Sequence, residues 1–408
     1  MKRGPRGLCA GFIVASPPIV IHVGMMTPLL VLMIVAGWLL VFTMHLSQRR
    51  QLRSPSSAGD DHPPVSILKP LKGVDADLET NLESFFDLDY PEYELVFGVQ
   101  DPSDPALAVA RRVADRHPDV SARFVAGGPD IGLNRKVNNL ANILPRVRHE
   151  HLLISDSNVM VMPDMLSDMM GHLARPGVGL VTSLIRGTGG RGLGGALESL
   201  QLNTFVMGGV AAVSGFGRVC AVGKSMLLRR RDLERIGGFA RLGRFLAEDQ
   251  VCGEEIDAIG LKVVVCPRPV DNVLGRLSVR SFAGRHLRWA RIRRRINPIA
   301  YAGEILTNPV PPALALLLVN PGAMSFAMAA VTVFILSAAA FESERVLGIR
   351  RRALVYPPLA ILRGLTVGAG WPVPLLSSTV AWRGTRYRVG PRTLLEPKRG
   401  RQPSNESV

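Results

Sequence analysis

The sequence has few cysteines, and their spacing argues against a disulfide framework or a zinc site. Its 408 residues contain only four of them: Cys9, Cys220, Cys252 and Cys266. No two form a C-x-x-C pair, and none has histidines at the spacing that structural zinc sites require. We therefore expect buried thiols in a protein of a reducing compartment.

Aromatic and acidic residues are also scarce. Phe, Trp and Tyr make up 6% of the chain, and 33 Asp and Glu face 49 Lys and Arg, which gives a formal net charge of +16. Such an excess predicts an anionic partner, which is nucleic acid, an anionic membrane surface or a phosphorylated substrate. The sequence contains no RNA-recognition or zinc-finger pattern, so we expect no nucleic-acid partner.

Apolar residues make up 47% of the chain and are unevenly spread. The apolar run 13–46 follows a short basic start and is long enough for one membrane span. Because it is too long for a signal peptide and lacks an A-x-A-like cleavage site, we expect an uncleaved anchor. The stretches 309–341 and 353–376 predict one or two spans each, or re-entrant segments where prolines and glycines interrupt them.

The loop 342–352 between these two stretches carries four arginines and two glutamates. If each stretch crossed the membrane once, this loop would lie outside, against the tendency of positive loops to remain inside. A re-entrant pair would keep the loop inside and remove the conflict. The sequence leaves the two topologies open.

Between residues 65 and 277, short strand patterns alternate with helical patterns. Strands are expected at 65–68, 93–99, 122–125, 151–154, 178–185 and 262–266, and helices at 78–86, 106–116, 136–143, 162–172, 232–236 and 248–259. This alternation predicts an α/β domain with a mostly parallel sheet and helices on both faces. Ligands bind such sheets beyond the carboxyl ends of strands, where Lys72, Asp101 and Asp156 fall.

Two glycine-containing motifs do not fulfil the requirements of nucleotide-binding loops. Residues 187–192 (GTGGRG) match G-x-G-x-x-G, but no acidic residue ends a further strand about twenty residues on. We interpret this stretch as a mobile loop. Residues 222–225 (VGKS) resemble the end of a P-loop, but Arg218 stands where that motif requires glycine. Lys224 and Ser225 remain candidates for contact with substrate.

A carboxylate pair and an arginine cluster indicate chemistry on an activated phosphate compound. Asp249 follows Glu248 at the start of a predicted helix, and Arg285, Arg288 and Trp289 lie further along in an amphipathic helix, 278–296. A carboxylate suits a general base, and clustered guanidiniums suit a diphosphate leaving group. A basic amphipathic helix is also typical of a segment that only docks on an anionic membrane surface.

These motifs together resemble one known family. In order they read KPLKG at 69–73, VQD at 99–101, NRKVNNL at 134–140, DS at 156–157, GKSML at 223–227, AED at 247–249 and R-x-x-RW at 285–289. This series is similar to the ceramide glucosyltransferases, membrane-anchored glycosyltransferases that use nucleotide sugars and have the GT-A fold. The resemblance covers about residues 65–309 and extends to Trp382 and Arg383.

The resemblance implies roles for particular residues. The sugar donor would be bound by Lys72, Asp101, Lys136, Asn138 and Asp156. Of these, Asp101 would hold the uridine part and Asp156 would bind a divalent cation, Mg²⁺ or Mn²⁺, on the diphosphate. Asp249 would be the general base that deprotonates a lipid hydroxyl. Arg285, Arg288 and Trp289 would face the diphosphate and the acceptor.

Two departures from related patterns qualify these roles. The wider glycosyltransferase class often shows D-x-D at the metal site, whereas Asn158 replaces the second carboxylate here, so the metal would depend on Asp156 alone among these residues. Processive polysaccharide synthases of the same fold usually have glutamine at the position of Arg285. The arginine therefore favours a single transfer, in which a UDP-α-sugar gives a β-glycoside.

The sequence predicts an integral membrane enzyme with a GT-A domain facing the cytoplasm. It would move a sugar, most simply glucose, from a UDP-sugar to the hydroxyl of ceramide or a similar sphingolipid. A hopanoid or other bacterial lipid is an alternative acceptor, and a non-catalytic scaffold on anionic lipid is an alternative class. The expected parts are an anchor at 1–53, a linker at 54–64, a GT-A domain at 65–277, a basic interfacial helix at 278–308, membrane segments at 309–380 and a basic cytoplasmic tail at 381–408.

Overall fold

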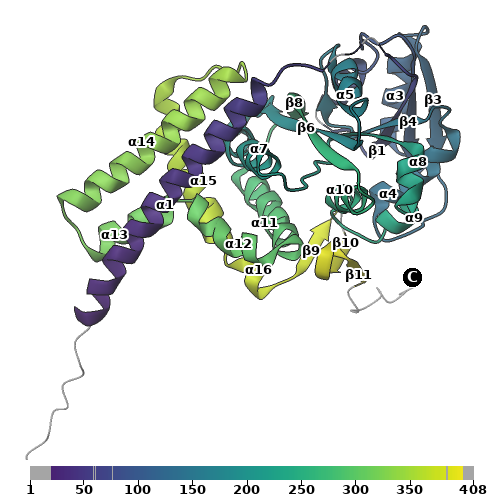
Figure 1. Cartoon of the computed structure of the whole chain (residues 1–408). Coiled ribbons are helices and arrows are strands. Elements are labelled where there is room, and N and C mark those ends of the chain that lie inside the picture. The colour runs from purple at the N-terminus through teal and green to yellow at the C-terminus, as the bar shows by residue number, and fades with distance from the viewer. Residues whose placement is uncertain (1–19, 58, 60, 76, 383–384, 398–408) are drawn as a thin grey trace, which may run out of the picture.

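The computed structural model describes residues 20–57, 59, 61–75, 77–382 and 385–397. Its centre is an eight-stranded sheet in the order β3-β2-β1-β4-β7-β6-β8-β5 (Figure 1). The strands are β1 (Val65–Leu71), β2 (Tyr93–Val99), β3 (Ser121–Ala126), β4 (His151–Ser155), β5 (Val159–Met160), β6 (Val178–Thr188), β7 (Ser225–Arg229) and β8 (Lys262–Val273). The predicted α/β class is confirmed.

The sheet is mixed rather than uniformly parallel. β1 pairs in parallel with β2 and β4, β2 with β3, and β6 with β8. β7 lies antiparallel between β4 and β6, and β5 pairs antiparallel with β8. The strand patterns predicted neither β5 nor β7, because both are short and β7 begins at Ser225, the last residue of the GKS motif. β7 matters for the site, since it places that motif beside the end of β4.

Helices cover both faces of the sheet, as the alternating pattern predicted. One apolar core packs α2, α3 and α5 against the sheet, and a second packs α4, α8, α9 and α10 against the opposite face. These helices are α2 (Leu78–Glu83), α3 (Pro105–Asp115), α4 (Arg135–Ile143), α5 (Met165–Leu173), α8 (Arg230–Arg235), α9 (Gly238–Leu242) and α10 (Glu248–Ala258).

The glycine-rich stretch after β6 is a tight turn that leads into α6 (Gly192–Gln201), and not a long loop. A Cβ on Gly194 would lie 2.3 Å from the backbone of Ser278, and one on Gly190 would lie 2.6 Å from the carbonyl oxygen of Gly195. These glycines therefore permit close backbone packing of α6 against the start of α11 (Val279–Ile296). The expectation of a mobile loop was wrong, because dense packing also requires glycine.

Membrane-type helices gather at one side of the α/β domain (Figure 1). Among the described residues, three helices are long and apolar enough to cross a membrane: Met26–Leu52, Ala323–Val346 and Ala353–Leu376. A bent pair, Pro298–Thr307 and Val310–Val319, with 60° between its halves, makes a fourth span or a re-entrant segment. The elements are α1 (Val20–Leu52), α12 (Pro298–Gly303), α13 (Val310–Val319), α14 (Ala323–Val346), α15 (Tyr356–Gly370) and α16 (Val373–Leu376).

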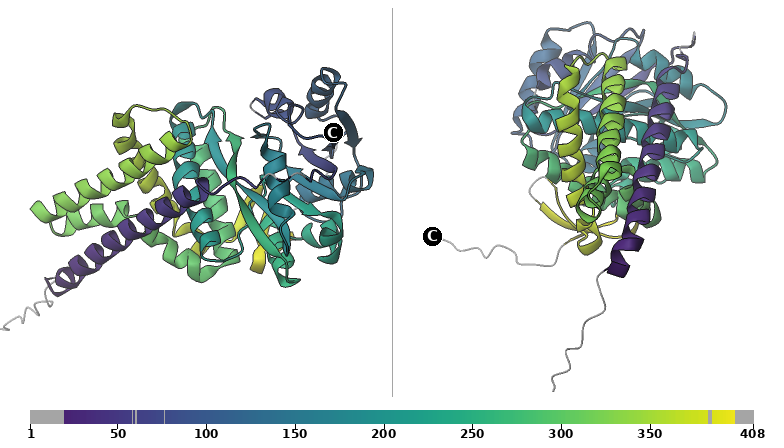
Figure 2. Two further views of the ribbon diagram at one scale, coloured as in Figure 1. Left: turned by 45° about the horizontal axis from the view of Figure 1, so that its top comes forward. Right: turned by 90° about the vertical axis from the view of Figure 1, so that its left-hand side faces the viewer.

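The arginine-rich loop 342–352 lies at the end of the helices next to the α/β domain. Glu342 forms an ion pair with Arg49 at the basic end of α1, with 2.7 Å between Oε1 and Nη1. Leu347 is buried against Leu184 of β6, and its carbonyl accepts a hydrogen bond from Arg186. Figure 2 shows α1 and α14 side by side, with α14 ending toward the domain. The loop therefore lies at the same end of these helices as the α/β domain.

The chain after α16 forms a small antiparallel sheet of β9 (Thr379–Trp382), β10 (Thr385–Val389) and β11 (Leu395–Pro397). The sequence reading found no helix or strand pattern in this tail, and for these residues it was wrong. The strands are only three to five residues long and are stabilised by packing of Val380, Val389 and Leu395 on Leu246, just before α10. The part of the expected tail at 398–408 and the start of the anchor at 1–19 lie outside the described residues.

Candidate active site

The register between β4 and β7 brings an acidic and a basic residue together at the edge of the sheet. Ser155 pairs with Ser225, so Asp156, just beyond β4, lies opposite Lys224, just before β7. Nζ of Lys224 is 3.0 Å from Oδ2 of Asp156 and 2.7 Å from Oδ1 of Asn158. The lysine of the GKS motif therefore places a positive charge at this edge of the sheet.

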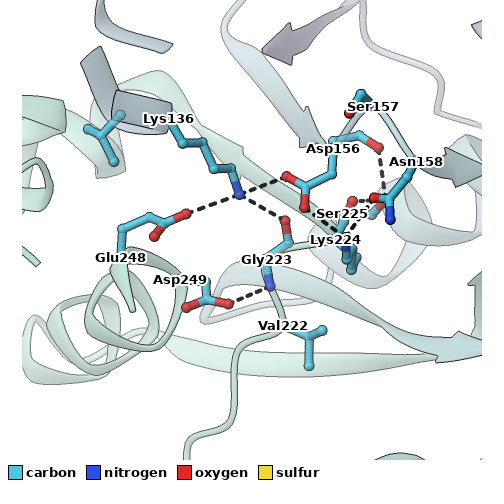
Figure 3. Close-up of polar contacts among 12 residues, drawn as sticks. Lys136, Asp156, Ser157, Asn158, Val222, Gly223, Lys224, Ser225, Glu248 and Asp249 are labelled. Carbon is cyan, nitrogen blue, oxygen red and sulfur yellow. Dashed lines mark hydrogen bonds and ion pairs between the residues drawn. The ribbon is translucent and has the colours of Figure 1, made fainter. Parts of the chain in front are cut away.

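Lys136 connects this edge to α10 (Figure 3). It lies in the first turn of α4, and its Nζ is 2.9 Å from Oδ1 of Asp156 and 3.0 Å from Oε1 of Glu248. The same ammonium donates to the carbonyl of Gly223 over 3.2 Å. Burial alone would lower the pKa of Lys136, but Asp156 and Glu248 outweigh it and raise that pKa, so Lys136 stays charged.

Asp156 is ionised for the complementary reason. Burial alone would raise the pKa of its carboxyl group, but Lys136 and Lys224 together hold that pKa well below its usual range. Lys69 donates from Nζ to the backbone carbonyl of Asp156 over 2.7 Å, which fixes the turn after β4. The carboxylate is therefore a permanent negative charge, held in place from both its side chain and its backbone.

Asp249 lies on the other side of Gly223 from this ion-pair network. Its Oδ2 accepts a hydrogen bond from the backbone N–H of Gly223 over 2.8 Å, and Oδ1 accepts one from that of Gln250, also over 2.8 Å. Burial, together with the charge of Glu248, raises the pKa of Asp249 to about 6. A carboxyl group with such a pKa is mostly ionised at neutral pH and remains basic enough to accept a proton, as a general base requires.

Glu248 joins α10 to α4 through a hydrogen bond with Asn134, which its position at a helix start did not predict. Oε2 accepts a hydrogen bond from Nδ2 of Asn134 over 3.0 Å, and the same Nδ2 donates to the carbonyl of Phe245. Asn134 also caps α4 through its side-chain oxygen. The first turns of α4 and α10 are thereby joined, which places Lys136 and Asp249 on either side of Gly223.

Three other predicted donor-binding residues lie at the same sheet edge or beside it. Lys72 directly follows β1, and Asp101 follows β2, where its side chain accepts two hydrogen bonds from Ser103. Asn138 is buried in α4, and its amide group makes four hydrogen bonds to the loop 130–132. Asn138 therefore shapes that loop, and its predicted contact with the donor stays a prediction.

The arginine motif lies on α11 and is held by a residue that the sequence reading missed. Glu198 of α6 is fully buried, and its two carboxylate oxygens lie 3.2 Å from Nη1 of Arg285 and 3.1 Å from Nε2 of His286. The ring of His286 in turn packs edge-on against Trp289, with 5.3 Å between centroids. A single carboxylate in the apolar stretch 192–203 was the available signal for this role.

The site has donors that fit a divalent cation bound together with a diphosphate. Asp156, Glu248 and Asp249 carry three formal negative charges against two on Lys136 and Lys224, so these five residues leave a net charge of −1. Mg²⁺ commonly binds through one or two carboxylates plus substrate phosphates. The carboxylate of Asp156 and the amide oxygen of Asn158 are hard oxygen ligands of this kind, so the residues present fit the predicted cation.

A second group of potential ligands lies elsewhere, on α5 and β8. Asp168, His172 and Cys266 are buried, and their ligand atoms lie within 4.8 Å of one another. Asp168 already accepts hydrogen bonds from Cys266 and from Ser56 and Ser57 of the linker. A thiol and an imidazole suit zinc rather than a cation on a diphosphate. None of these residues was predicted to be a metal ligand, and none of them contacts the ion-pair network around Lys136.

Most of this chain is similar to known glycosyltransferases. The sequence model of glycosyl transferase family 21 matches residues 29–395. Two ceramide glucosyltransferases of Caenorhabditis elegans, numbers 3 and 1, are 29% and 30% identical to the chain over 294 and 249 residues, or 69% and 61% of its length. These matches span 63% and 53% of the two relatives, so the chain covers less than two thirds of either.

A solved structure with a similar chain course is a mannosyltransferase from Pyrobaculum calidifontis in complex with GDP-Man and Mn²⁺. It is 19% identical in sequence, and the match covers 84% of this chain and 99% of that one with a TM-score of 0.47.

Proposed function

The chain belongs to glycosyl transferase family 21, and we propose that it is an inverting enzyme that moves glucose from UDP-glucose to the hydroxyl of ceramide or a similar sphingolipid. The observation that carries the proposal is the arrangement about Gly223. A carboxyl group with a pKa of about 6 lies on one side, and a charged lysine–aspartate network lies on the other.

The chemistry follows from these positions. Asp249 takes the proton from the acceptor hydroxyl while the hydroxyl oxygen forms a bond to C1 of the sugar. The bond between C1 and the phosphate oxygen breaks, and its electron pair leaves with UDP. Lys136 and Lys224 stabilise the negative charge that develops on the leaving diphosphate. A single displacement of this kind inverts the anomeric centre, so a UDP-α-sugar gives a β-glycoside.

A divalent cation, Mg²⁺ or Mn²⁺, would be held by Asp156 and would neutralise charge on the diphosphate when bound. Asp156 is suited to this because its low pKa keeps it ionised at any physiological pH. Lys136 and Lys224 each have further acceptors, the carbonyl of Gly223 and the amide oxygen of Asn158, that keep them near the phosphates. Lys72 and Asp101, at the ends of the neighbouring strands, complete the donor site with the uridine on Asp101.

The catalytic domain would face the cytoplasm. The end of α1 next to the domain carries Arg49 and Arg50, and the loop 342–352 at the same end carries four arginines. Positive residues next to membrane spans are retained on the cytoplasmic side. The arginines of α11 beyond Trp289 would lie against anionic head groups of the same membrane surface.

The direct test is incubation of the purified protein in detergent with a panel of labelled UDP-sugars and ceramide, followed by mass spectrometry of the lipid. We expect a β-linked glucosylceramide from the wild type and none from Asp249→Asn. Asp257→Asn, at an exposed position of the same helix, serves as the control and should retain activity. Transfer to a hopanoid but not to ceramide would show that the acceptor is a bacterial lipid. Lipid binding without transfer of any sugar would indicate a non-catalytic scaffold.

A further inference from the structure

Three cavities lie in a row where the membrane helices meet the α/β domain. The outer cavity lies between α1, α14, α15 and a short π-helix, Leu202–Val206, that follows α6. The middle cavity lies between the π-helix, α15 and the bend before α13, and the inner cavity lies between α11, α12 and α15. Phe205, Thr307 and Arg363 line both the outer and the middle cavity. Gln201, Val367 and Trp371 line both the middle and the inner cavity.

Arg363 stands at the first of these junctions with part of its hydrogen-bonding capacity unused. It lies in the centre of a candidate span, Ala353–Leu376, and is 9% exposed. Nη1 donates to Oε1 of Gln201 over 3.1 Å and to Oγ1 of Thr204 over 3.3 Å, while the buried Nε has no partner. In the part of the chain that the structure describes, no carboxylate forms an ion pair with it. An arginine buried in a membrane segment without a counter-ion is costly and marks a functional position.

The walls of the row combine apolar surface with polar groups, and the charged residues Glu304 and Arg293, which also line it, are paired with each other. Leu336 and Ala360 line the outer cavity, and Pro311 and Val367 line the middle one. Gln48, Thr204 and Gln201 add amide and hydroxyl groups at intervals along the row. A lipid has this combination of an apolar chain and a head group with hydroxyl and carbonyl oxygens. Those oxygens would satisfy the free N–H of Arg363.

The inner end of the row reaches the arginine motif. His286 and Leu287 line the inner cavity and directly precede Arg288 and Trp289 on α11. Trp289 packs against the same apolar core as Val222, whose neighbour Gly223 binds the proposed base, Asp249. The row therefore runs from the membrane helices to α11, where it ends beside the residues of the arginine motif.

We propose that these three cavities are the path by which the acceptor lipid reaches the active site, and that Arg363 binds its polar head group at the junction. This inference rests on the lipid glycosyltransferase function proposed above. The amides and hydroxyls around Arg363, in a lining where Glu304 and Arg293 pair with each other, select a lipid with hydroxyl and amide groups. The path would open by separation of α15 from the π-helix, where Arg363 is the polar connection.

Narrowing the path at the second junction tests the proposal. Val367 lies in the wall between the middle and inner cavities, and Val367→Phe places a larger side chain there that narrows both. Leu365→Phe adds a similar bulk at an exposed position of the same helix and serves as the control. We expect Val367→Phe to raise the KM for ceramide in mixed micelles at least about 10-fold, while the KM for the UDP-sugar stays unchanged. Leu365→Phe should alter neither constant. Equal effects of the two variants, or an effect on the UDP-sugar alone, would overturn the path.

The role of Arg363 has its own readout. Arg363→Gln should raise the KM for ceramide about 10-fold or more, and Arg363→Lys should restore part of the loss, with the KM for the UDP-sugar unchanged in both. If Arg363→Gln only removes co-purified anionic phospholipid, seen by native mass spectrometry, and leaves the KM for ceramide unchanged, Arg363 serves a structural lipid instead and the proposal is wrong.

A measurement on the wild type avoids dependence on folded variants. A diazirine-bearing ceramide should label peptides that contain Phe205, Thr307 or Val367, and excess unlabelled ceramide should suppress the labelling. Labelling confined to the outer, lipid-facing sides of α1 and α14 would contradict the path. Because labelling needs no sugar transfer, it also separates failure of the path from failure of the proposed function, which would show as absent transfer by the wild type with any UDP-sugar.

Discussion

The ammonium of Lys136 lies 2.9 Å from the carboxylate of Asp156, although the two residues come from different elements, a helix start and a strand end. The same Nζ also contacts Glu248, beside the proposed base, and the carbonyl of Gly223. One lysine therefore connects the residue proposed to bind the cation with the helix that carries the base.

The pH dependence of transfer should show a single acidic limb near pH 6. Because the folded pKa of Asp249 is about 6, above its ordinary value of 3.8, kcat/KM should rise through pH 6 as the carboxylate forms and level off above pH 7. Because the pKa of Asp249 is higher in the folded protein than in the unfolded chain, the contribution of this group to the free energy of unfolding decreases as the pH rises from about 4 to 6. Glu248→Gln removes a neighbouring negative charge and should move the limb to lower pH. If the acidic limb of this variant stayed at the same pH, a group other than Asp249 would be responsible for it.

Lys224 should matter for the sugar donor and not for the lipid. Lys224→Met removes a charge-assisted contact of about 1.5–3 kcal/mol, so we expect the KM for the UDP-sugar to rise about 10- to 100-fold. The KM for the lipid should stay unchanged. Lys262→Met, an exposed lysine at the start of β8, is the control. Initial-rate kinetics with each substrate varied in turn decide the matter, and a rise in the lipid KM alone would contradict the assignment.

Gly223 should tolerate no side chain. A Cβ at this position would lie 2.8 Å from Oδ2 of Asp249, where it would displace the carboxylate from its backbone N–H donor. We expect Gly223→Ala to lower kcat by about 100-fold or more, as a small misplacement of a catalytic group does. Gly59→Ala, where the added Cβ meets nothing within 4 Å, should leave kcat unchanged. A fully active Gly223→Ala enzyme would argue against Asp249 as the base.

Glu198 should act as a positioning residue for the arginine motif. Glu198→Gln removes the charge that pairs with Arg285 and His286 in a buried place, so we expect a loss of about 2–4 kcal/mol in stability, discounted because Arg285 is partly exposed. Glu83→Gln removes an exposed ion pair with Arg116 and should change thermal stability little. A purely structural role would lower the melting temperature only, whereas positioning of Trp289 through His286 should also lower kcat at temperatures where the variant is folded.

Removal of the divalent cation should weaken donor binding. In EDTA we expect UDP to bind much more weakly in calorimetry, with Mg²⁺ or Mn²⁺ restoring the affinity. Asp156→Asn should raise the Mn²⁺ concentration needed for half of that restoration by about 10-fold or more. Asp164→Asn, whose exposed carboxylate contacts Arg268, is a control away from the site. UDP binding that is equal with and without cation would remove the metal from the proposal and leave charge neutralisation to Lys136 and Lys224.

Much of the fold was predictable because its signals are local. Strand and helix patterns gave the α/β class and placed the helices at 106–116, 136–143 and 248–259 close to α3, α4 and α10. Together with family membership, the observed sheet and candidate spans confirm the predicted GT-A domain flanked by membrane helices. The strands β5, β7 and β9–β11 were missed, because their stability comes from neighbours distant in sequence. β5 pairs with β8, β7 pairs with β4 and β6, and β9–β11 pack on Leu246.

By itself the sequence determined which residues lie at strand ends and helix starts, because hydrophobic periodicity and capping are written within a few positions of each other. It therefore named Asp101, Asp156 and Asp249 as residues of one sheet edge. Only the tertiary structure decided how they are joined. The antiparallel register of β7 brought Lys224 to Asp156, and packing of α4 beside α10 placed Lys136 between Asp156 and Glu248. Lys136 and Asp156 are 20 residues apart, and Lys224 and Asp156 are 68 apart, so no pattern of a few positions encodes these contacts. They form only when the sheet and its helices assemble.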